Sequence, residues 1–86
     1  MNRNNQNDLS NIRTTFATFL LDSREKLGYD RNQVSQRLGV AEKVIEEWEC
    51  GKRPIDLVEL RAYCQAIDLP LDECIAFLDT ISEEVF

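Results

Sequence analysis

Apolar residues recur every three or four positions along most of the chain, the spacing that places them on one face of an α-helix. No segment combines sustained alternation with the β-branched enrichment that is typical of a strand. The few glycines and prolines divide the chain into segments of helical length. The pattern therefore predicts an all-α protein.

Five helices are predicted, and residues that begin or end helices bound them. Their expected ranges are 10–27, 31–38, 41–50, 57–67 and 71–84, and the first of these is an extended helix. Asp30 and Asp56 are the expected N-caps of the second and fourth helices. Gly28, Gly39 and Gly51 are expected to end the first three helices.

The same periodicity identifies a candidate core. The residues expected to face inward are Ile12, Phe16, Phe19, Leu20 and Leu27 in the first helix, Val34, Leu38, Val40, Ile45 and Trp48 around the second and third, and Leu57, Leu60, Cys64, Ile67, Leu71, Cys74, Ile75, Leu78 and Ile81 in the last two. Such stripes are typical of helices that each cover one side of a small core.

Length and composition bound the functions open to this chain. Its 86 residues suffice for one small domain, expected over 10–86 behind a disordered, Asn-rich tail over 1–9. The lack of histidine excludes Ser-His-Asp and Cys-His catalysis, so no enzyme, cofactor, metal site or small-molecule substrate is expected. Three scattered cysteines without a CxxC pair or a signal sequence indicate a reduced, cytoplasmic protein. The apolar runs are too short to span a membrane.

The net charge of −6 argues against nucleic-acid binding, because phosphate contacts usually need a basic surface. The charge is unevenly distributed along the chain. Residues 1–53 hold nine of the ten Lys and Arg with eight acids, net +1, whereas residues 54–86 hold one cation with eight acids, net −7. The acidity therefore lies mainly in the last two helices and does not by itself exclude DNA binding.

The most informative segment is residues 31–50, RNQVSQRLGVAEKVIEEWEC. Two short helices are joined there by one tight turn, at which Gly39 supplies the residue that tolerates a positive φ. Val34, Leu38 and Ile45 are apolar where two steeply crossing helices must meet, and Ser35 is small where they approach closely. This pattern is typical of a helix-turn-helix.

The segment and its flanks resemble the phage-repressor and Cro-like helix-turn-helix family, often called XRE-type. The resemblance covers about Phe16 to Phe77 and includes SREKLG before the motif, RLGV at the turn, the W-E-x-G-K-R pattern in WECGKR after it, and LDE beyond the fourth helix. It implies a five-helix, lambda-repressor-like DNA-binding domain. It also implies that the third helix enters the major groove and that two copies bind DNA as a two-fold dimer.

Family positions carried onto this chain give candidate roles for ten residues. The resemblance implies that Glu42, Lys43 and Glu47 read bases, with Ala41 at the groove edge, that Arg31 and Asn32 meet phosphate, and that Lys52 and Arg53 grip the far side of the groove. It also implies a structural ion pair between Arg24 and Glu49. Trp48 is expected in the core rather than stacked on a base.

The third helix departs from the family pattern. Its segment AEKVIEEWEC holds four glutamates and one lysine, and Glu42 and Glu46 repel each other at i and i+4. Lys43 is expected to form an ion pair with Glu47, which lies four residues later. Ala41 stands where the family usually has a Ser or Thr cap, although Glu42 in the first turn partly compensates through the helix dipole.

Two hypotheses follow. The first is a sequence-specific regulator of transcription that binds double-stranded DNA as a homodimer. The two copies are expected to meet through the fifth helix. The apolar surplus at Phe77, Val85 and Phe86 suggests this dimer contact, although the same residues suit a core role equally well. The alternative is a protein-interaction module, such as an adaptor, an antitoxin-like partner or a phage-encoded inhibitor, that kept the fold and lost DNA binding.

Overall fold

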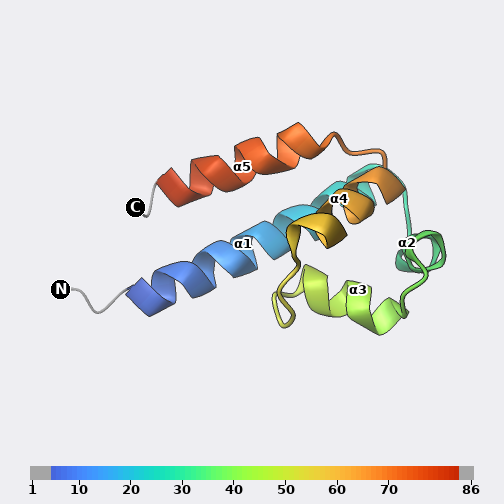
Figure 1. The fold of residues 1–86 in the computed structure, drawn as a ribbon, viewed down its shortest axis with the longest axis horizontal. Helices are drawn as coiled ribbons and strands as arrows, with labels where there is room; N and C mark the ends of the chain where they lie inside the picture. The colour runs from blue at the N-terminus through green and yellow to red at the C-terminus, as the bar shows by residue number, and fades with distance from the viewer. Residues whose placement is uncertain (1–4, 84–86) are drawn as a thin grey trace.

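A computed structural model describes residues 5–83, and over this range the chain contains five α-helices and no strand (Figure 1). The helices are α1 Asn5–Lys26, α2 Arg31–Leu38, α3 Glu42–Glu49, α4 Leu57–Ala66 and α5 Leu71–Glu83. The prediction of an all-α protein with five helices is confirmed over these residues. Most boundaries agree with the predicted ranges within one or two residues.

The start of α1 is the exception. The helix begins at Asn5, so the prediction of a disordered tail over 1–9 is wrong for residues 5–9, and residues 1–4 lie outside the described range. No glycine or proline occurs between Asn5 and Lys26, so nothing in this stretch interrupts the i to i−4 hydrogen-bond ladder. The extended first helix is therefore longer than the apolar pattern alone predicts.

Helices α2, α3 and α4 gather at the C-terminal half of α1, and α5 runs back along α1 (Figure 1). The buried core lies where these elements meet, and its apolar members include Phe16, Leu20, Val34, Ile45, Trp48, Leu60, Tyr63, Cys64, Ile67 and Cys74. Trp48 is buried and meets Tyr63 edge-on, with ring centroids 6.4 Å apart, as a core residue would.

Three residues predicted to face inward do not. Leu27 is 44% exposed, Leu57 is 65% exposed and Ile75 is 41% exposed. Leu27 follows the last residue of α1, where the chain turns away from the core. Leu57 is the first residue of α4, and the other elements within residues 5–83 leave most of its side chain uncovered. Spacing along one helix identifies a stripe, but only the positions of the other helices decide how far it is covered.

Phe77, one of the residues considered for a dimer contact, packs inside the chain. Its ring stacks on Phe19 of α1 with centroids 4.2 Å apart and planes within 9°. Phe19 in turn stacks on Phe16, so three aromatic rings connect α5 to the core. The other two residues in that hypothesis, Val85 and Phe86, lie outside the described residues.

Candidate nucleic-acid interface

The turn between α2 and α3 fixes the relative position of the two helices. Gly39 has φ 70°, and its N–H donates to the carbonyl of Ser35 at 2.9 Å. The Ser35 hydroxyl donates back across the turn to the carbonyl of Val40 at 2.7 Å. Val34 and Ile45 are fully buried between the helices. These contacts hold α3 in one orientation against α2.

The N-terminus of α2 is closed by the predicted cap. The Asp30 side chain accepts from the Gln33 N–H at 2.8 Å, and the Gln33 side chain accepts from the Asp30 N–H at 2.8 Å. By contrast, Ala41 is the N-cap of α3 and provides no side-chain hydrogen bond. The amides at the start of α3 therefore lack one acceptor that a Ser or Thr would supply.

The solvent-facing side of α3 carries the residues predicted to read bases. Glu42 and Lys43 are exposed, Glu47 is partly exposed, and Ala41 lies exposed at the N-terminal edge. Glu46, one turn after Glu42, shares this face, which we call the α3 outer face (Glu42, Lys43, Glu46 and Glu47). The opposite side holds buried Ile45 and Trp48, so the helix is strongly two-sided.

Asn32, predicted to meet phosphate, contacts Glu42 of α3 in this structure. Its Nδ2 donates to Oε2 of Glu42 at 2.8 Å, which joins the first turns of α2 and α3. Both side chains are exposed, so this contact is open to replacement by another hydrogen-bonding group. It places the predicted phosphate contact beside the predicted base contact.

Glu47 pairs with Arg53 rather than with Lys43. The Nη2 and Nε atoms of Arg53 both lie 2.8 Å from Oε1 of Glu47. The Arg53 N–H also donates to the Glu47 carbonyl at 3.2 Å, which brings the loop back onto α3. The expected interaction of Lys43 with Glu47 is wrong, because the loop brings a guanidinium with two converging donors to the same carboxylate.

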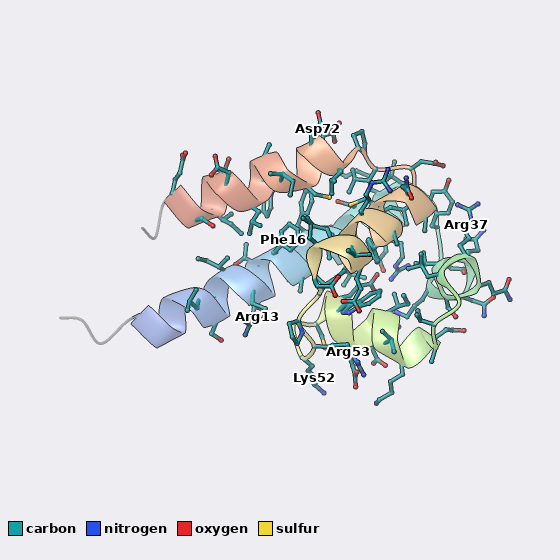
Figure 2. All side chains as sticks on the ribbon, in the orientation of Figure 1. Arg13, Phe16, Arg37, Lys52, Arg53 and Asp72 are labelled. Atoms are coloured by element: carbon teal, nitrogen blue, oxygen red, sulfur yellow. The ribbon has the colours of Figure 1, made fainter. Side chains whose placement is uncertain are left out.

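The loop after α3 presents two cations beside the outer face. Figure 2 shows Lys52 and Arg53 at this loop, on the side of the molecule away from Asp72 at the start of α5. Arg13 of α1 points toward the same side and lines one groove together with Arg53. Lys43 and Lys52 form no ion pair with any other described residue. The cations of this loop thus lie on the side of the molecule opposite the acidic start of α5.

Behind the α3 outer face, a buried ion pair joins α1 to α3. Arg24 and Glu49 are 5% and 4% exposed, and they meet through two hydrogen bonds, Nε to Oε2 at 2.7 Å and Nη2 to Oε1 at 3.0 Å. Arg24 Nη1 also donates to the carbonyl of Tyr29 at 2.9 Å. The structure therefore forms the pair that the resemblance implied, in a bidentate geometry.

Tyr63 of α4 completes this cluster. Its hydroxyl donates to Oε2 of Glu49 at 2.5 Å and lies 3.1 Å from the Leu20 carbonyl. Burial alone raises the pKa of Glu49, but hydrogen bonds from Arg24 and Tyr63, together with the Arg24 charge, hold it below the usual value. Burial, and then the Glu49 carboxylate, raise the pKa of the Tyr63 hydroxyl, so it remains a donor.

Arg31, the second residue predicted to meet phosphate, also reaches Glu49. Its Nη2 and Nε atoms lie 3.3 Å from Oε1, and its side chain is 35% exposed. Arg24 already occupies the same carboxylate at shorter distances, so Arg31 is the more weakly held partner. Arg31 thus lies at the boundary between the buried cluster and the surface.

Sequence reasoning did not identify two residues of this region, Arg13 and Tyr63. Tyr63 had a usable signal, since it falls three residues after Leu60 and one before Cys64 on the inward stripe of α4. Arg13 had none, because its place beside the loop depends on how α1 packs against α3 and α4.

An apolar groove opens between α1, α4 and α5, with a volume of about 370 Å³. The exposed side chains of Leu9, Leu57 and Ile75 line it. Leu57 and its neighbour Val58, which is 79% exposed, leave an apolar patch at the start of α4.

Within residues 5–83, no group of side chains is arranged to hold a metal ion. None of the described helices combines the length and apolarity needed to cross a membrane. A protein-family model described as helix-turn-helix matches residues 20–74, from the second half of α1 into α5. A search of curated proteins gives no match to the chain.

Proposed function

The chain belongs to the XRE-type helix-turn-helix family of DNA-binding proteins, and we propose that it is a transcriptional regulator that binds double-stranded DNA sequence-specifically as a dimer. The observation that carries this proposal is the position of the cations. Lys43 on α3 and Lys52 in the following loop are exposed without an acidic partner among the described residues. Phosphate contacts need such available cations.

The acidic character of α3 is less of an obstacle than its sequence indicates. Glu49 is buried and compensated by Arg24, and Glu47 is paired with Arg53. Glu42 is hydrogen-bonded to Asn32, so Glu46 is the only carboxylate of the outer face without a partner among the described residues. A carboxylate on this face can accept from the N4 amine of cytosine, which gives Glu42 and Glu47 a role in base selection.

We assign the remaining roles by position. Lys43 is proposed to contact bases, Ala41 lies at the groove edge, and Lys52 contacts phosphate directly. Arg31, Asn32 and Arg53 are already held by carboxylates, so each exchanges a carboxylate partner for phosphate on binding. Each of these side chains makes charge-assisted hydrogen bonds both before and after DNA binding. The exchange therefore limits the binding free energy that each contact adds.

The dimer contact is proposed on the apolar patch rather than on the residues first considered. Phe77 stacks on Phe19 within the same chain, so its ring is not available for a dimer contact. Leu57, Val58 and Ile75 remain exposed around the groove beside α5, and a second copy of the chain would cover them. Two recognition helices of such a dimer lie roughly 34 Å apart if they enter successive turns of one groove.

Fluorescence polarisation with a labelled random duplex tests the proposal. The parent chain should bind at low salt, with an affinity that falls linearly with salt on a logarithmic plot. The double substitution Lys52→Ala, Arg53→Ala should weaken binding similarly for every duplex and reduce the salt slope by up to about two. A matched control, Lys26→Ala with Arg61→Ala, removes the same charge from exposed positions on α1 and α4 away from the α3 outer face.

Two outcomes contradict the proposal. Binding that is equally weakened by the control pair would mean that only net charge matters. No binding at tens of micromolar protein in low salt would favour the protein-interaction module, in which the same fold binds another protein.

Selection of preferred sequences from a random pool, repeated for Glu42→Gln and Glu47→Gln, tests whether the outer face selects bases.

A further inference from the structure

Two cysteines in the core, remote in sequence from the helix-turn-helix, lie in direct contact. Cys64 of α4 and Cys74 of α5 are 1% and 0% exposed, and their Sγ atoms are 2.9 Å apart. The third cysteine, Cys50, is exposed at the end of α3. The contact therefore links two helices. One is α4, whose Tyr63 hydrogen-bonds to Glu49, and the other is α5, which lines the apolar groove.

We propose that Cys64 and Cys74 are a redox-sensitive pair, which hydrogen peroxide converts into a disulfide that joins α4 to α5. A disulfide needs an S–S distance of about 2.0 Å, so the sulfurs must approach by about 0.9 Å. Because the fold holds both sulfurs together, their reaction with each other is favoured over reaction with a second oxidant molecule.

The chemistry balances with one molecule of peroxide. One cysteine thiolate attacks a peroxide oxygen, the O–O bond breaks, and hydroxide leaves and takes up the thiol proton as water, which forms a sulfenic acid. The second sulfur then attacks the sulfenic sulfur, the S–O bond breaks, and the leaving hydroxide takes the second thiol proton as water. Both sulfurs are oxidised, and peroxide is reduced to two waters.

A surface hollow gives a small oxidant a route as far as Cys64, whereas Cys74 is fully buried and does not line the hollow. Cys64 lines it together with Gln65 and Leu69, at the connection between α4 and α5. The Cys64 S–H hydrogen bond lowers the pKa of the Cys74 thiol, whereas the same contact and burial raise the pKa of Cys64. Of the two thiols, Cys74 therefore gives up its proton more readily than Cys64.

The expected consequence is a more stable fold with an unchanged DNA-facing side. The bond closes a short loop through the α4–α5 connection, which reduces the entropy of the unfolded chain. The α3 outer face and the loop after it are not part of this link. The inference therefore does not depend on the proposed function.

The test uses the full chain with Cys50→Ser, so that no exposed thiol contributes. The folded protein is treated with near-stoichiometric hydrogen peroxide and analysed by intact mass, thiol titration after denaturation, and thermal melting. We expect a loss of two hydrogen atoms and of both thiols, a melting temperature higher by roughly 10 °C, and full reversal by dithiothreitol. DNA affinity, compared within this background, should be unchanged.

Cys50→Ser with Cys64→Ala and Cys50→Ser with Cys74→Ala are the matched controls, and neither should lose two hydrogen atoms. If one of these variants fails to fold, the other still shows whether the loss of two hydrogen atoms requires both cysteines. The proposal is overturned if peroxide adds oxygen atoms to the parent without joining the sulfurs. It is equally overturned if the bond forms only in denaturant.

Discussion

Glu47 of α3 and Arg53 of the following loop form an ion pair in which two guanidinium nitrogens lie 2.8 Å from one carboxylate oxygen. The family resemblance gives these residues separate tasks, one at the bases and one at the phosphates. In this chain each is the other's partner. For the phosphate contact proposed for Arg53, the strength of this pair sets how readily the guanidinium is released.

Glu47→Gln should strengthen binding to random duplex severalfold at low salt, because it removes one negative charge and releases Arg53 for phosphate. Glu46→Gln removes the same charge from the same face but releases no arginine among the described residues. Fluorescence polarisation over a salt series compares the two. Only the Glu47 variant should increase the salt slope, by about one, and equal slopes would show that the ion pair does not restrain Arg53.

Glu49→Gln should destabilise the protein by about 3 kcal/mol, since it leaves the Arg24 charge buried without its counter-ion. Urea unfolding followed by tryptophan fluorescence measures the change. Glu46→Gln, an exposed position on the same helix, should shift the unfolding free energy by less than about 0.5 kcal/mol. A Glu49 variant within about 1 kcal/mol of the parent would mean that water enters the cluster.

Stability should fall on acidification, and Glu49 should be a main cause. Its pKa in the folded protein lies below the ordinary value of 4.5, so the folded state binds the proton less readily than the unfolded chain. The stabilisation is complete above the unfolded pKa and is lost as pH falls through the folded one. Chemical unfolding between pH 7 and pH 2 should show a smaller loss for Glu49→Gln, and equal losses would place the effect on other carboxylates.

Ala41→Ser should stabilise the protein by about 1 kcal/mol, or roughly 5 °C in melting temperature, because it supplies the missing side-chain acceptor at the start of α3. Asp56→Ala makes the opposite change at the start of α4, where the Asp56 side chain accepts from the Glu59 N–H at 2.7 Å. Thermal melting should move in opposite directions for the two variants. No gain at Ala41 would indicate that water already satisfies those amides.

Leu57→Ser combined with Ile75→Ser should shift the chain toward monomer, because both side chains belong to the surface proposed for the dimer. Leu27→Ser is the control, since Leu27 is 44% exposed and does not line the groove. Sedimentation velocity over a concentration series measures the association. Dissociation of the control to the same degree, or a parent that is monomeric throughout, would contradict the proposed contact.

The sequence by itself determined the helices and the place of the helix-turn-helix. Apolar spacing, the caps Asp30 and Asp56 and the turn at Gly39 act over a few residues, so their effect can be read locally. The family resemblance added the Arg24–Glu49 pair, which no local rule contains. The start of α1 was misplaced because polar composition in the first residues outweighed the absence of any helix-breaking residue there.

Only the tertiary structure decided which polar side chains meet. Arg53 rather than Lys43 reaches Glu47, Arg31 joins Glu49, and Cys64 touches Cys74, although i to i+4 spacing favoured the Lys43 contact and no sequence pattern indicated the other two. Leu57 is on the predicted stripe yet stays exposed, because the other described helices leave that end of α4 largely uncovered. Helical periodicity fixes the direction in which a side chain leaves its own helix. What it contacts depends on elements that packing brings there from elsewhere in the chain.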